Sequence, residues 1–239
     1  MEECLKEIFD QIEQATNDLG TWELLFRGHS STDYQLLPTL HRSERLDFER
    51  SVFYTYKASS ASLNGGTKSN WDIILDMQHY GLPTRLLDWT SSFGTALYFA
   101  LLGNPQTPCI WLLNPYKLNE ASTGSPILYD LSSVPDIGGQ PEYNIGQIMA
   151  GNCKLEVPYA IRPPHGNSRI SAQRGLFTVH TNSSEPLEAL CPEAVRRIDI
   201  KPEKIIEYKR YLHYLGIDEF SVFPDQEGLA KQLKRTYSL

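Results

Sequence analysis

Residues 78–90, Gln-His-Tyr-Gly-Leu-Pro-Thr-Arg-Leu-Leu-Asp-Trp-Thr, gather several side chains that could do chemistry. The imidazole of His79 titrates near neutral pH, which suits general acid–base work. Arg85 can bind an anion through a fork of donors, and Asp88 can stabilise a developing positive charge. The Gly-x-Pro break predicts a connection that aims fixed polar groups into a cleft. The alternative is a buried Arg85–Asp88 ion pair that only holds the loop.

Length and composition indicate one globular domain over residues 1–239 with a hydrophobic fraction of 41%. No apolar run approaches the roughly 20 residues that cross a bilayer, so no membrane association is expected. The acidic N-terminus lacks the pattern of a secretion signal. The 4 cysteines include no CxxC pair, which argues against a zinc site and fits a reducing cytoplasm.

The charge of the chain gives no general attraction to nucleic acid, because the net charge is −7. A local basic groove remains open, since Arg162, Arg169 and Arg174 are close in sequence. The spacing and residue types predict no metal site, although His79 together with Asp88 leaves one open.

Hydrophobic periodicity and helix-breaking residues predict an α+β fold, with helices early and late and strands between them. A helix is expected within residues 1–20, a strand at 22–28 and a helix at 44–62. Asn70 is expected to cap a helix at 71–80, and Ser91 or Ser92 one that follows the strand at 86–90. The remaining expectations are strands at 109–113, 156–161, 170–181 and 195–200, a long surface excursion at 115–155, and C-terminal helices within 201–239.

Three polar segments lie at the ends of predicted strands, and they are residues 26–29, 84–92 and 169–177. The first holds Phe-Arg-Gly-His, and the second leads into a helix with the sequence Ala-Leu-Tyr-Phe-Ala. The third holds Ala-Gln-Arg-Gly-Leu-Phe. These motifs, the sequence of residues 78–90 and Phe-Pro-Asp at 223–225 resemble the FRG domain family, which is named for its Phe/Tyr-Arg-Gly motif.

The order of the three polar segments is also similar to the Arg–Ser–Glu layout of ADP-ribosyltransferases. Arg27 matches the arginine of the first strand, and Thr90, Ser91 and Ser92 match the Ser-Thr-Ser that precedes a helix. Gln173 is the candidate at the third position. This resemblance implies a central split or mixed β-sheet flanked by helices, with an ADP-ribosyltransferase-like core.

The resemblance implies NAD as the substrate and a macromolecule, protein or nucleic acid, as the acceptor of ADP-ribose. Cleavage of the nicotinamide–ribose bond passes through an oxocarbenium-like state, so the protein mainly positions groups and stabilises charge. Such an activity suits a bacterial toxin or a phage-defence effector. The expected NAD-binding residues are Arg27, Gly28, His29, Thr90, Ser91, Ser92 and Phe99. The candidate catalytic residues are Arg27, His79, Arg85, Asp88 and Gln173.

Gln173 departs from the enzyme pattern, which has a glutamate at that position. Either a carboxylate comes from elsewhere, with Asp88 ahead of Glu156, or the site binds a nucleotide without efficient turnover. Two other functions therefore stay open. One is a non-catalytic module that binds nucleotides or nucleic acid, and the other is a nuclease-like enzyme that uses His79, Arg85 and Asp88.

Overall fold

The computed structural model describes residues 2–62, 68–131, 145–164 and 168–238. These described residues form one seven-stranded sheet in the order β4-β5-β6-β2-β1-β3-β7. Only β4 and β5 run parallel, so the sheet is mixed, as predicted. The strands are β1 (Leu25–His29), β2 (Leu86–Thr90), β3 (Cys109–Leu113), β4 (Tyr129–Asp130), β5 (Tyr159–Arg162), β6 (Gly175–Val179) and β7 (Val195–Asp199).

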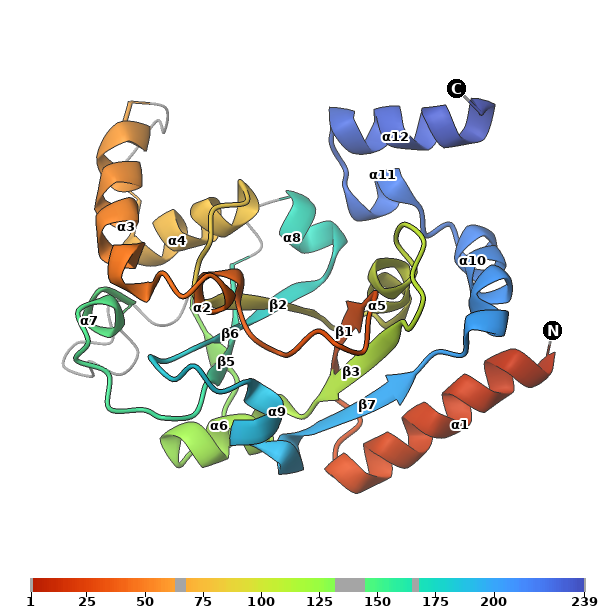
Figure 1. Cartoon of the computed structure of the whole chain (residues 1–239), viewed down its shortest axis with the longest axis horizontal. Coiled ribbons are helices and arrows are strands. Elements are labelled where there is room, and N and C mark those ends of the chain that lie inside the picture. The colour runs from red at the N-terminus through yellow and green to blue at the C-terminus, as the bar shows by residue number, and fades with distance from the viewer. Residues whose placement is uncertain (1, 63–67, 132–144, 165–167, 239) are drawn as a thin grey trace.

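Helices surround the sheet, with α1 and α10 near β7 and with α3, α4 and α7 at the opposite end (Figure 1). The N- and C-terminal helices lie on the same side of the molecule in that view. The helices are α1 (Glu2–Leu19), α2 (Thr39–Arg42), α3 (Leu46–Ser60), α4 (Asn70–His79), α5 (Phe93–Ala100), α6 (Pro115–Thr123), α7 (Ile145–Met149), α8 (Ser168–Ala172), α9 (Leu187–Leu190), α10 (Ile205–Tyr214), α11 (Glu219–Val222) and α12 (Gln226–Tyr237).

Strand β3 lies between β1 and β7, and all of its side chains are buried. Ile110 and Leu112 pack into a core with α1, α5 and α10, whereas Cys109, Trp111 and Leu113 pack into a second core on the other face. The period of two thus divides one continuous apolar strand between two cores. A third core joins α4 and α7 to β5 and β6.

Strands β1 and β2 diverge along most of their length. Their ladder has a single register pair, Phe26 with Thr90. In contrast, β1 pairs with β3 from Leu25 to His29, and β2 pairs with β6 from Leu86 to Thr90. The sheet is therefore continuous through one residue pair and open beside it, which leaves room for side chains and a ligand between two central strands.

Capping residues and a glycine define the ends of the helices on either side of β2. Ser69, rather than the predicted Asn70, caps α4, because its side chain accepts a hydrogen bond from Asp72 N in a capping box. Gly81 follows the helix with φ +79, which favours glycine at this position. The next helix, α5, is capped by Ser92, whose hydroxyl accepts from Thr95 N.

Two further predictions of secondary structure differ from what the structure shows. The strand predicted at 170–181 is shorter, because α8 occupies the first part and β6 begins at Gly175. The predicted excursion at 115–155 contains a capped helix, α6, whose Leu118 and Asn119 are buried, as well as β4 and α7. Residues 132–144 of that segment lie outside the described residues. In the described part of the chain, no helix combines the length and the apolar character that a membrane span needs.

Candidate functional site

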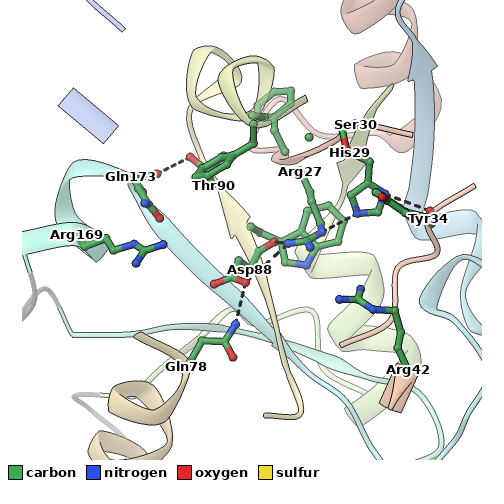
Figure 2. Close-up of a pocket in the computed structure, with 15 residues that line it drawn as sticks. Arg27, His29, Ser30, Tyr34, Arg42, Gln78, Asp88, Thr90, Arg169 and Gln173 are labelled. Carbon is green, nitrogen blue, oxygen red and sulfur yellow. Dashed lines mark hydrogen bonds and ion pairs between the residues drawn. The ribbon is translucent and has the colours of Figure 1, made fainter. Parts of the chain in front are cut away.

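A pocket of about 650 Å³ opens where β1 and β2 diverge, and we call it the Arg27 pocket. Residues from β1, β2, α2, α4, α5, α8, the loop before α2 and the α8–β6 turn line it. Figure 2 shows Arg42 and Arg169 approaching from opposite sides of Asp88. The polar side chains of the lining include Arg27, Arg42, Arg169, Asp88, Gln78 and Gln173.

Arg27 bridges the gap between the two strands. Its Nη1 donates to the backbone carbonyl of Asp88 at 2.7 Å and lies 3.9 Å from the Asp88 carboxylate. Desolvation by burial lowers the pKa of Arg27, the Asp88 charge raises it, and Arg42 lowers it further. The guanidinium nevertheless stays charged at any physiological pH. The pocket therefore has a fixed cation at its wall.

His29 holds that cation in place. The Nε of Arg27 donates to His29 Nε2 at 2.9 Å, so this imidazole nitrogen is an acceptor without a proton. The proton then sits on Nδ1, which donates to the carbonyl of Tyr34 at 3.2 Å. Burial, and then the charge of Arg27, lower the pKa of His29 to about 3. His29 is thus a neutral group that orients Arg27.

Asp88 is held by a short chain of hydrogen bonds. Gln78 Nε2 donates to Asp88 Oδ2 at 2.8 Å, and the Thr84 hydroxyl donates to Gln78 Oε1. The buried Thr84 hydroxyl orients the side chain of Gln78, so the amide nitrogen of Gln78 points at the carboxylate of Asp88. The side chain of Asp88 is 56% exposed, and it keeps its carboxylate in contact with the pocket.

The close approach of α5 to β1 explains why a glycine, Gly28, follows Arg27. A Cβ at this position would lie 1.9 Å from the carbonyl oxygen of Ala96 and 2.5 Å from Ala100 N. Strand β1 and helix α5 therefore touch backbone to backbone at the floor of the pocket. This close contact brings Ala96 and Phe99 to the lining.

Gln173 lies in the turn between α8 and β6, and not on a strand as predicted. Its backbone carbonyl accepts from the Thr90 hydroxyl at 2.6 Å, which ties the turn to the end of β2. Its side-chain amide donates to the carbonyl of Val222 at 3.1 Å, which ties the turn to α11. Both Gln173 and Thr90 line the Arg27 pocket.

Arg85 lies in a buried network away from the pocket lining, and its partner there is Glu49, not the Asp88 of the alternative ion pair. Arg85 is 1% exposed and forms a fork with Glu49 of α3, with Nε to Oε1 at 2.8 Å. Its Nη1 donates to the carbonyl of His180 at 2.7 Å. Such a bidentate pair, completed by backbone carbonyls, anchors α3 to the sheet.

Four further candidate residues do not line the pocket. His79 does not line it, and burial and the nearby Arg169 lower the pKa of His79. Ser92 caps α5, and Ser91 lines a second pocket instead. Glu156 is exposed and absent from the lining.

Five polar lining residues were given no role in NAD binding from the sequence: Ser30, Tyr34, Arg42, Gln78 and Arg169. The sequence contained a signal for Gln78 and for Arg169, because each opens a polar segment, at residues 78–90 and 169–177. Arg42 is held by the Leu37 carbonyl at 2.8 Å, and Arg169 lies over the Phe223 ring at 4.6 Å. Of the three arginines for which a basic groove was left open, Arg169 lines this pocket, whereas Arg162 and Arg174 do not.

Residues 2–62, 68–131, 145–164 and 168–238 contain no group of three or more His, Cys, Asp or Glu side chains that could hold a metal ion.

Fold and pocket together define an α+β domain with a cationic pocket between two diverging central strands. Residues 22–107 of the chain match the family model of the FRG domain. The match includes Arg27, Asp88 and Thr90 and ends before the segment with Gln173. No curated protein and no solved structure matches the chain. Because a domain type does not define an activity, the function has to be argued from the pocket.

Proposed function

We propose that the Arg27 pocket binds NAD and transfers its ADP-ribose to a macromolecule or to water. The observation that carries this proposal is the meeting of the three polar segments, far apart in sequence, in one pocket. Arg27, Thr90 and Gln173 all line it, together with Asp88. The order of these segments along the chain is the order that resembles ADP-ribosyltransferases.

The charge and size of the pocket support a dinucleotide ligand. Its volume of about 650 Å³ lies within the range of ordinary small-molecule sites. Arg27, Arg42 and Arg169 face an otherwise mixed lining, and guanidinium groups bind pyrophosphate oxygens through paired donors. Phe99 and Tyr34 offer aromatic faces for a base or for nicotinamide.

In the proposed reaction the nicotinamide–ribose C–N bond breaks, and nicotinamide leaves with the bonding electron pair. Positive charge then develops at ribose C1′, and a carboxylate close to it lowers the barrier. The nucleophile, an acceptor group or water, forms the new bond to C1′ and releases its proton to the surrounding water. Asp88 is the carboxylate in this pocket, so we assign charge stabilisation to Asp88 rather than to the uncharged Gln173.

A toxin or phage-defence role would follow from such an activity, because loss of NAD or modification of a macromolecule harms the cell that contains it. This part of the proposal rests on the resemblance. The acceptor, protein or nucleic acid, would approach from the open side where Asp88 is exposed.

A binding-only module is the second candidate, and one observation favours it. The amide of Gln173 is engaged with the carbonyl of Val222, so this position supplies no charge and holds α11 in place. The nuclease alternative has less support, since Arg85 is buried against Glu49 and His79 does not line the pocket.

The experiment is NAD consumption and NAD binding by the purified protein, with and without cell lysate. Wild type is compared with Arg27→Met, and the control is Arg50→Met on the exposed side of α3. We expect NAD loss with wild type and the control, and not with Arg27→Met. Labelled ADP-ribose on a lysate component indicates transfer, and free ADP-ribose indicates hydrolysis. Binding without turnover favours the module, and no binding by any variant overturns the proposal.

A further inference from the structure

A second pocket, of about 450 Å³, lies on the other side of the Phe26–Thr90 pair, and we call it the Trp22 pocket. Phe26 lines both pockets, Thr90 lines the first and Ser91 the second. Residues before β1, the beginnings of α6 and β6 and the end of β5 form its walls. Nothing in the proposed NAD reaction uses this pocket.

Trp22 is the unusual side chain of this pocket. It is 82% exposed, whereas Trp71, Trp89 and Trp111 are at most 9% exposed. Burying a tryptophan is strongly favourable, so an exposed indole at the rim of a pocket marks a place where a ring can stack. Such indole faces bind nucleobases in sequence-tolerant sites.

Two arginines stand in the same pocket, Arg162 at the end of β5 and Arg174 before β6. Both are exposed, and neither guanidinium makes a hydrogen bond or an ion pair within the described residues. The one carboxylate of the lining, Glu23, accepts a hydrogen bond from the Tyr116 hydroxyl. The pocket is therefore locally cationic on a chain with a net charge of −7.

The backbone of Arg174 adds an independent observation. Its φ is 47, a left-handed conformation that is strained for a residue other than glycine. Two hydrogen bonds hold it there, from Arg174 N to the Ser171 carbonyl at 3.1 Å and from Ser91 N to the Arg174 carbonyl at 3.1 Å. Strain of this kind persists at binding sites, and glycine at this position would remove it.

We propose that the Trp22 pocket binds a nucleoside phosphate, with the base stacked on Trp22 and the phosphate held between Arg162 and Arg174. Arginine pairs are suited to phosphate oxygens because each guanidinium offers parallel donors. Glu23 then lies at the pocket wall as an acceptor for amino or hydroxyl groups of the ligand. The ligand is a free nucleotide or one unit of a single strand, since both present the same ring and phosphate.

The test is quenching of tryptophan fluorescence by AMP, because Trp22 is the one exposed tryptophan of the four. We expect saturable quenching that Trp22→Phe abolishes. Adenosine and inorganic phosphate, each lacking one half of the ligand, should bind at least about tenfold more weakly. A short single-stranded oligonucleotide that binds more tightly than AMP, in a salt-dependent manner, identifies a strand as the source, and equal affinity identifies the free nucleotide.

Variants separate this site from the Arg27 pocket. Arg162→Met should weaken AMP binding at least about tenfold, and Arg27→Met should leave Trp22 quenching unchanged. Arg174→Gly should weaken binding while raising the melting temperature, because it removes both the guanidinium and the strain. Loss of quenching in Arg27→Met, no saturation by AMP, or equal binding of phenyl phosphate would overturn the assignment. None of these results depends on whether the protein consumes NAD.

Discussion

The Nε of Arg27 and the Nε2 of His29 are joined by a hydrogen bond of 2.9 Å, and this bond requires a neutral imidazole. If Nε2 carried a proton, two N–H groups would face each other beside a positive charge. The orientation of the pocket arginine is therefore linked to the protonation of its neighbour, which has consequences for stability in acid.

The free energy of unfolding should fall as the pH is lowered from above 6.5 toward 3. The pKa of His29 is about 3 in the folded protein and near 6.5 in the unfolded chain, so the unfolded chain binds the proton first. The contribution is fully present above pH 6.5 and decreases below it. Burial also lowers the pKa of His41 and His180, which adds to the slope. In urea denaturation across this range, His29→Gln should give a shallower slope, and an unchanged slope would contradict the assignment.

Gly28→Ala should destabilise the fold by about 3 kcal/mol, since overpacking of a rigid contact costs this order of free energy. The new methyl group would meet backbone atoms of Ala96 and Ala100, which cannot move without displacing α5. Gly175→Ala is the matched control, because a Cβ there meets its nearest neighbour, Ile170, at an ordinary 3.5 Å. Chemical denaturation of both variants measures the difference, and equal stabilities would exclude the close contact.

Arg85→Met should cost about 3–5 kcal/mol of stability, because it leaves the carboxylate of Glu49 buried without its partner. Replacing both residues by apolar ones of similar size should recover most of this loss. Denaturation of the single and double variants gives the coupling free energy. If Arg85→Met instead folded with wild-type stability and lost only activity, the structural role of Arg85 would be wrong.

The local elements followed from the sequence better than the partners of their charged residues did. The helix within 1–20, the strands at 86–90 and 109–113 and the capping of α5 by Ser92 follow from periodicity, breakers and caps, which act over a few residues. The pairing of Arg85 with Glu49 was not predicted, because Glu49 lies on α3, which no local pattern connects to β2.

The candidate site was predicted only in part, because some of its contacts join segments that no local pattern connects. Arg27, Thr90 and Gln173, one from each of the three polar segments, line one pocket together with Asp88. The five-residue helix α8 is too short to show a helical period, so Gln173 was placed on a strand. The basic groove that was left open for Arg162, Arg169 and Arg174 is divided between two pockets, because Arg169 on α8 lines one and Arg174 in the α8–β6 turn lines the other with Arg162.

Asp88→Asn should abolish NAD turnover and change the melting temperature by only a few degrees, which corresponds to about 1 kcal/mol in a domain of this size. The asparagine oxygen can still accept from Gln78, so the loop keeps its geometry while the charge is lost. Asp199→Asn, at an exposed ion pair with Arg197, is the control for removal of a surface charge. Thermal melts of both variants measure the change in stability, and NAD assays measure the change in turnover. A collapse in stability would show that Asp88 anchors the loop instead.

Gln78→Glu should move the acidic limb of the activity profile to higher pH by about one unit or more. The amide nitrogen of Gln78 lies 2.8 Å from Asp88 Oδ2, so the substitution places two carboxylates against each other. Two carboxylates at that distance cannot both be ionised without a large cost, so the variant pair keeps a proton to a higher pH than a single carboxylate does. Activity measured from acidic to neutral pH should recover as the pH rises. A profile with the wild-type midpoint and a lower plateau would mean that Gln78 acts on substrate directly, and not through Asp88.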